Sequence, residues 1–427
     1  MNRRRACARF GAAAMAVLRA AVIAMPSIAG ASAPELLGFG SRAKAMAGAV
    51  TATSASHEAV YYNPAALAGV RRTTIHLGVE TSGFSLSLEG APVALDRFSA
   101  LDLGFAVPIP FRGALADRVV LGFGFVLPMG TVLVADVPLP GEPRFVRVDP
   151  RAQTVSLMGA LGVTITDGFA LGGGFIALSE LRGSIDVAPN ETGKIGTTVR
   201  DELVAAYAPI LGAQLTALAP LSLGLSFRGE STAEFDLPIT ADLGGAFPLP
   251  IPRLDVSGTA QYDPLMLTLG AAWSFDSGLL IAVDVAYEAW SGYPSPIRYT
   301  AVPAGFPAQP EPGFSDVLAA RAGAELSIST ALGLTFEPRV GLAVRPTPVP
   351  SPSRGYLDGS ILAGGIGLGG RAGQLTLDLA AALQLSLPRS TALSDPVPGL
   401  PRPSLAGRSV DHGATIASLS LELGVEL

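Results

Sequence analysis

Hydrophobic and polar residues alternate along much of the chain with a period of two. The stretch QLTLDLAAALQLSL, residues 374–387, places leucine or alanine at every odd position and mostly polar or small residues at every even one. The C-terminal stretch SLSLELGVEL, residues 418–427, repeats this pattern. Successive side chains of a β-strand point to opposite faces, so the pattern predicts strands with one apolar face and one polar or small face.

Fourteen such segments can be recognised, and the connections between them alternate in length. Tight links such as TDG and DSG alternate with long proline-rich stretches such as RPTPVPSPSRG. An even strand count, short turns at one rim and long loops at the other are typical of outer-membrane barrels. We therefore expect an all-β fold, a transmembrane antiparallel β-barrel. Its strands should lie near residues 74–88, 98–107, 118–127, 153–166, 169–187, 202–218, 221–237, 256–274, 279–290, 315–329, 331–345, 356–370, 374–387 and 412–427.

The alternation also predicts which side chains face the barrel interior. Arg228, Arg321 and Arg339 share the parity of nearby glycines and lie opposite the aliphatic rows. An arginine facing the middle of a bilayer would cost about 2–4 kcal/mol, so these side chains should point inward. On the same grounds, the expected lumen-lining residues are His76, Arg228, Asp284, Glu288, Arg321, Glu325 and Arg339.

The composition agrees with the predicted barrel and argues against several other classes of protein. Of the 427 residues, 49% are hydrophobic and 15% are charged, against roughly 25% charged in soluble domains. No stretch after residue 30 has the 18 or so uninterrupted apolar residues of a membrane-spanning helix. The formal charge is −6 and the chain has only two lysines, which argues against a nucleic-acid partner.

The N-terminus predicts export from the cytoplasm. Four arginines within the first nine residues precede the apolar stretch GAAAMAVLRAAVIAM and the small residues AGASA, which is the layout of a secretory signal peptide. We expect this peptide over residues 1–33; cleavage after Ala31 would avoid the unfavourable Pro34. The only cysteine, Cys7, would be removed with it, which suits an oxidising compartment. Together with the barrel pattern, this predicts the outer membrane of a Gram-negative bacterium.

The chain offers little for catalysis. Barrel lipases need a serine and a histidine facing the bilayer, whereas His76 has the parity of an ordinary polar lumen residue. No group of His, Cys and acidic residues has the spacing of metal ligands. The stretch GGIGLGG, residues 364–370, lacks the helix that follows a dinucleotide loop, and crowding in the lumen explains its glycines better. We expect no enzyme activity, no catalytic residues, no cofactor and no metal site.

Several segments carry a family signature when they are taken in order. Residues 38–70, GFGSRAKAMAGAVTATSASHEAVYYNPAALAGV, combine a small-residue stretch with the motif Asn63, Pro64 and Ala65. LGFGFVLPMG follows, then AVDVAYEAWSGY, then DVLAARAGAELSI with LTFEPRVGLAVRPTPVP. In this order they resemble four segments of the FadL and TodX family of outer-membrane hydrophobic-compound channels. These are the hatch, the third strand, a strand with an Asp followed by Trp-Ser, here Asp284, Trp290 and Ser291, and the late pair of strands.

This resemblance implies an organisation and a function. It implies a fourteen-stranded barrel over residues 73–427 and a small N-terminal hatch or plug over residues 34–72. Proline fixes its own φ and restricts the residue before it, so the Asn63-Pro64 corner would brace the hatch against the wall where family members open sideways. A simple tight turn into the first strand is the alternative. The implied activity is passive uptake of long-chain fatty acids or aromatic hydrocarbons with hatch gating and lateral release.

The implied partners are hydrophobic small molecules, outer-membrane lipids and the barrel assembly machinery, with the channel acting as a monomer. Candidate residues of a ligand groove are the loop aromatics Phe145, Phe247, Phe306 and Phe314, which could instead pack on one another. A general porin, a structural outer-membrane barrel and a large periplasmic β protein are the competing interpretations. Three features depart from the family pattern: the chain ends in Leu427 rather than an aromatic residue, aromatic residues are sparse, and the loops are shorter and richer in proline than in the fatty-acid transporters.

Overall fold

The computed structural model describes residues 33–93, 95, 97–129, 144–147, 155–189, 195–241, 254–294, 297–298, 311–395 and 406–427. The expected signal peptide falls outside the described residues except for Ala33, and so do Phe247 and Phe306. Within the described residues, no helix is long and apolar enough to cross a membrane.

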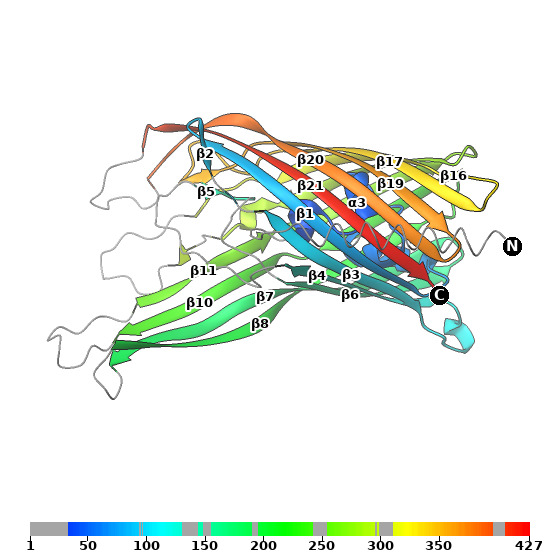
Figure 1. Ribbon diagram of the computed structural model, residues 1–427, viewed down its shortest axis with the longest axis horizontal. Helices are drawn as coiled ribbons and strands as arrows, with labels where there is room; N and C mark the ends of the chain where they lie inside the picture. The colour runs from blue at the N-terminus through cyan, green and yellow to red at the C-terminus, as the bar shows by residue number, and fades with distance from the viewer. Residues whose placement is uncertain are drawn as a thin grey trace.

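Fourteen strands of the described chain close into one antiparallel barrel, as the sequence predicts. Consecutive wall strands pair with each other, and the first and last strands complete the ring through a register from Thr74↔Glu426 to Leu88↔His412 (Figure 1). The wall strands are β1 (Thr74–Leu88), β3 (Phe98–Pro108), β4 (Val119–Pro128), β6 (Ser156–Thr166), β7 (Phe169–Pro189), β8 (Ile195–Leu215), β9 (Leu221–Arg228), β12 (Leu265–Ser274), β13 (Leu279–Ala289), β15 (Val317–Leu326), β17 (Leu334–Arg345), β19 (Ile361–Ala372), β20 (Leu375–Ala392) and β21 (Ser409–Glu426).

Shorter elements accompany the wall. The additional strands are β2 (Ala91–Val93), β5 (Arg144–Phe145), β10 (Ser231–Ala241), β11 (Leu254–Asp263), β14 (Ile297–Arg298), β16 (Ile328–Ser329) and β18 (Tyr356–Leu357). The helical turns of the first seventy residues are α2 (Ala33–Leu37), α3 (Ser41–Ala45), η1 (Ser56–Glu58), α4 (Ala59–Tyr62) and η2 (Pro64–Gly69), and two more turns are η3 (Gly113–Leu115) and η5 (Trp290–Gly292).

The alternation of the sequence becomes an outer and an inner face of the wall. On β21, Leu419 is 60% exposed, whereas the neighbouring side chains Ser418 and Ser420 are buried inside. On β20, Leu379 and Leu383 lie exposed on the outer face. Because every backbone N–H and C=O in a closed barrel has a partner strand, this wall can present an aliphatic surface without unpaired edges.

Two predicted wall strands are divided in the structure: residues 256–274 form β11 and β12 with Pro264 between them, and residues 221–237 form β9 and β10. Residues 221–237 were expected to form one strand, but β9 ends at Arg228 and β10 leaves it to pair in parallel with β7. The pairing of β8 with β9 ends at Ile210↔Arg228. The residue of β8 that precedes Ile210 is Pro209. Its carbonyl oxygen accepts from the Gly229 N–H at 2.8 Å, but proline has no N–H to donate in return. Strand alternation continues through this point, so it gave no sign of the break.

The first described residues fold inside the barrel. The segment of residues 33–72, called the hatch below, contacts β6, β7, β8, β19 and β20 through its short helices. Figure 1 shows this blue segment enclosed by wall strands. Its sharp turns use glycine at positive φ, as at Gly38, Gly40 and Gly48, where a side chain would be strained.

Candidate functional site: the hatch and its seat

The barrel interior is lined by glycines wherever the backbone of the hatch approaches the wall. A Cβ added at Gly172 would lie 2.2 Å from the carbonyl carbon of Pro64, and one at Gly365 would lie 2.4 Å from the Lys44 carbonyl oxygen. Glycine is thus required for the close approach of backbone to backbone. A Cβ would also lie within 3 Å of hatch backbone at Gly162, Gly224 and Gly341, and within 3 Å of hatch side chains at Gly104, Gly122, Gly124, Gly212, Gly270, Gly323 and Gly367.

The Asn63-Pro64 corner joins two parts of the hatch to the wall. The Asn63 side chain donates to the Thr51 carbonyl at 2.8 Å and to the Ala213 carbonyl of β8 at 3.1 Å. Its Oδ1 accepts from the Ala65 N–H at 3.1 Å, which caps η2. Asn63 is fully buried, and alanine at this position would lose all three of these bonds.

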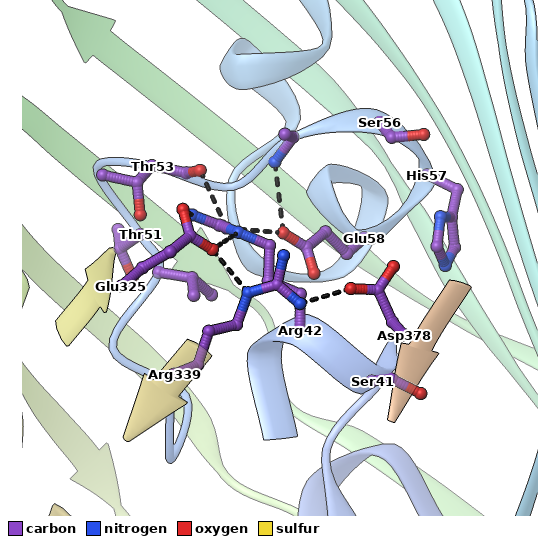
Figure 2. A network of polar contacts seen from close by, with 12 residues as sticks. Ser41, Arg42, Thr51, Thr53, Ser56, His57, Glu58, Glu325, Arg339 and Asp378 are labelled. Atoms are coloured by element: carbon purple, nitrogen blue, oxygen red, sulfur yellow. Dashed lines mark hydrogen bonds and ion pairs between the residues drawn. The ribbon is translucent and has the colours of Figure 1, made fainter. Parts of the chain in front are cut away.

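An ion-pair network holds the middle of the hatch against the late wall strands. Figure 2 shows Arg42 donating to Glu325 at 2.8 Å and to Glu58 at 2.9 Å. Arg339 on β17 shares Glu325, at 2.6 Å, and also pairs with Asp378 on β20. Paired charges of both signs satisfy one another here, which an isolated buried arginine could not achieve.

Lys44 anchors the hatch to the first two wall strands. Its ammonium group pairs with Glu80 on β1 and lies 3.4 Å from Asp102 on β3, and all three side chains are buried. Burial alone would lower the pKa of Lys44, but the two carboxylates hold that pKa above its ordinary value. Lys44 is therefore a buried cation whose only described ion-pair partners belong to the wall.

Glu35 fixes the start of the hatch to two wall strands. It pairs with Arg228 on β9 and with Arg345 on β17, and it accepts from the Tyr61 hydroxyl at 3.1 Å. Arg345 also donates to Glu288 at 2.7 Å, and the Trp290 indole donates to the same carboxylate. Burial would raise the pKa of Glu35, but Arg345 and Arg228 lower it to about 2.

We expect this anchor to loosen in acid. The folded-state pKa of Glu35 lies below its ordinary 4.5, so its contribution to stability is complete above pH 4.5 and is lost as the pH falls toward 2. In a Trp273→Phe background Trp290 is the one remaining tryptophan, and its fluorescence should change over this range. A Glu35→Gln variant should show the changed emission already at neutral pH. An identical acid response in both proteins would show that Glu35 does not hold this anchor.

The residues predicted to line the lumen lie inside the barrel, but they bind the hatch or each other. Asp284 accepts from the backbone N–H groups of Val50 and Thr51 at 3.1 and 3.0 Å. His76 donates to or accepts from Ser56 at 2.9 Å, and Arg321 lies 3.9 Å from Glu288. Together with Arg228, Glu325 and Arg339, they therefore form a binding surface for the hatch.

The two loop aromatics that the structure describes are packed. Phe314 stacks on Tyr293 with ring centroids 4.5 Å apart, and Phe145 contacts the edge of the His412 ring at 5.9 Å. Both phenylalanines are buried. The two phenylalanines pack in different clusters rather than on one another, and their role in a ligand groove stays a prediction.

The interior is apolar on one side of the barrel. Wall residues of β3, β4, β6, β7 and β8 form a buried cluster with hatch residues Phe39 and Leu67. A cavity of about 130 Å³ lies between the hatch and the wall, lined by apolar residues such as Leu37 and Met266 and by charged residues such as Glu35, Lys44 and Arg345. At the short-turn end, a vestibule of about 690 Å³ opens on the other side of the hatch. The wall members of the apolar cluster include Phe98, Val120, Val126, Met158, Ile176, Leu178 and Ile210.

Sequence reasoning missed most of the hatch partners. Glu80, Asp102 and Glu422 have the same inward parity as the predicted lumen residues, so the alternation could have found them. The hatch side chains Glu35, Arg42 and Lys44 lie in short helical turns, where no period of two operates, and only the three-dimensional structure reveals their partners.

The fold and the internal hatch define the class of protein, a plugged fourteen-stranded barrel. Several solved structures are similar to it over most of the chain. The chain matches a Pseudomonas aeruginosa FadL homologue with a TM-score of 0.62 at 16% identity, covering 91% of this chain and 98% of that one. It matches the P. putida toluene transporter TodX with a TM-score of 0.53 at 13% identity, covering 92% and 99%. The CymD monoaromatic hydrocarbon channel gives 0.52 at 14% identity, covering 92% and 98%.

These matches confirm the resemblance at the level of the fold, which is that of the FadL and TodX channels. No protein-family model matches the chain, and no curated protein matches it in sequence.

Proposed function

We propose that the chain is an outer-membrane channel through which hydrophobic compounds, long-chain fatty acids or aromatic hydrocarbons, diffuse passively past a gated hatch. The observation that carries this proposal is the closed barrel whose interior is filled by the hatch and lined on one side by an apolar cluster. An open aqueous pore would need a polar, unobstructed bore, whereas a greasy solute gains about 25 cal/mol per Å² of buried apolar surface along an apolar one.

The outer face supports a membrane location. Leucines such as Leu269 and Leu342, both 61% exposed, form an aliphatic surface around the barrel. Such a surface is suited to lipid, and large contiguous apolar patches are rare on soluble monomers. We propose export with the signal peptide of residues 1–33, insertion by the barrel assembly machinery and action as a monomer in the outer membrane of a Gram-negative bacterium.

Lateral release is proposed at the seam between β8 and β9. Wall pairing ends there at Ile210↔Arg228, and hatch residues contact both strands beside it. Asn63 donates to Ala213 of β8, and Glu35 pairs with Arg228 of β9. A shift of the hatch would therefore act directly on the two strands that border the seam.

The corner of the hatch gives a test of gating. Replacing Asn63 and Pro64 by alanine removes three hydrogen bonds of Asn63, each contributing about 0.5–1.5 kcal/mol, and the fixed φ of the proline. We expect uptake of labelled oleate or toluene by cells producing the variant to change several-fold while the barrel still assembles. Ser85→Ala, at an exposed position of β1 away from the hatch corner, serves as the control. Unchanged uptake would remove the gating role of this corner.

Transport itself is tested by uptake in cells that lack and regain the protein. Cells producing it should take up the hydrophobic compound faster than cells without it, and uptake of a sugar of similar mass should not change. Equal acceleration of both solutes would indicate a general porin instead.

A further inference from the structure

We propose that His57, His76 and Glu422 bind a divalent transition-metal ion that links the hatch to the barrel wall. His57 belongs to η1 of the hatch, His76 to β1 and Glu422 to β21. Their candidate ligand atoms all lie within 4.8 Å of one another. This inference concerns metal binding alone and does not depend on the transport function.

The distances require little movement to receive an ion. Glu422 Oε1 lies 2.8 Å from His76 Nδ1 and 3.7 Å from His57 Nε2. Ligands about 2.0–2.2 Å from a tetrahedral zinc ion are separated by similar lengths. The two imidazole rings stack with centroids 4.3 Å apart, and each has a nitrogen within 3.7 Å of the same carboxylate oxygen.

The groups around the three residues already orient them as ligands. Ser56 contacts Nε2 of His76 at 2.9 Å, and the Ser41 backbone N–H donates to the second oxygen of Glu422 at 3.0 Å. Such partners on the far side of a ligand fix its orientation toward a metal. His57 Nδ1 is buried and has no hydrogen-bond partner among the described residues.

Two wall glycines make room for the imidazoles. A Cβ at Gly104 would lie 2.3 Å from the His57 ring, and one at Gly424 would lie 2.6 Å from the His76 ring. Any other residue at either position would displace a ligand. The space for the rings is therefore part of the wall itself.

The ligand set and its access favour a particular class of ion. Two imidazole nitrogens and one carboxylate suit zinc and related transition metals, whereas calcium and magnesium prefer oxygen ligands throughout. All three residues line the vestibule at the short-turn end, which leaves a path for the ion and room for a water ligand.

Titration of the purified full-length barrel in detergent tests the site. After treatment with a chelator, the protein should bind one Zn²⁺ per chain by calorimetry, and Co²⁺ should give the visible absorption of a low-symmetry site. His57→Ala, His76→Ala and Glu422→Gln should each weaken binding by roughly 10- to 100-fold or more, at least the effect of losing an orienting partner. His412→Ala is the matched control, because His412 is also buried and bonds Thr391 instead.

Two further measurements separate a lost site from a lost fold. Heat-modifiable migration on gels should show that each variant still forms the barrel. In the wild-type protein, Zn²⁺ should slow hydrogen exchange in residues 56–62 of the hatch, a result that needs no variant. Absence of saturable binding at one ion per chain, equal affinity in the His57→Ala variant, or unchanged exchange on adding Zn²⁺ would each overturn the proposal.

Discussion

Replacing Gly365 by valine is expected to unseat the hatch, whereas the same change at Gly364 should leave it in place. A Cβ at Gly365 would lie 2.4 Å from the Lys44 carbonyl oxygen and 2.7 Å from that of Ala45. Backbone atoms cannot rotate away as the end of a side chain can, so the hatch must move. Overpacking of this kind costs about 1–3 kcal/mol. A difference of that size shifts an equilibrium between two states by roughly 5–150-fold.

Single-channel recording in planar bilayers measures this effect, since a displaced hatch should let ions pass. The frequency of open events should rise in Gly365→Val. Gly364 is the matched control because it lies on the outer face of the same strand, where an added Cβ would first meet Leu342 at 3.7 Å. If both variants conduct alike, the close contact at Gly365 does not hold the hatch.

Replacing Lys44 by methionine is expected to free the hatch by leaving Glu80 and Asp102 without their cation. One oxygen of each carboxylate already lacks a hydrogen-bond partner among the described residues. Removing one member of a buried ion pair costs about 3–5 kcal/mol. Hydrogen exchange should therefore accelerate over residues 41–50, and bilayer conductance should rise with it.

A compensated variant separates the charge effect from the loss of packing. In Lys44→Met with Glu80→Gln and Asp102→Asn, no buried charge is left unpaired, and most of the protection from exchange should return. The lysine would not be an anchor if Lys44→Met alone left exchange over residues 41–50 unchanged. Failure of the triple variant to recover would instead assign the effect to lost packing.

The wall could be predicted from the sequence because one physical rule sets it. Side chains alternate between two environments, so parity alone placed Arg228, Arg321 and Arg339 inside and the leucines of β20 outside. The closure of β1 on β21 also follows, because an unclosed edge would leave backbone groups unpaired in lipid. The break after Arg228 did not follow, since residues on both sides keep the same alternation.

The interior could be predicted only in part. The resemblance placed a hatch in residues 34–72, and the structure describes residues 33–72 within the barrel, but their partners depend on contacts across several hundred residues. Ser41 bonds Glu422, 381 residues away, and His57 meets His76 across the junction of hatch and wall. No spacing along the chain encodes such a meeting, which is why the sequence predicted no metal site.

The most direct test of the account is the conductance of the purified wild-type protein compared with a variant lacking residues 34–72. The account predicts that the wild-type barrel passes few ions because the hatch fills its bore, and that the truncated barrel conducts as an open pore. A large, steady conductance in the wild-type protein would contradict it and would favour a general porin.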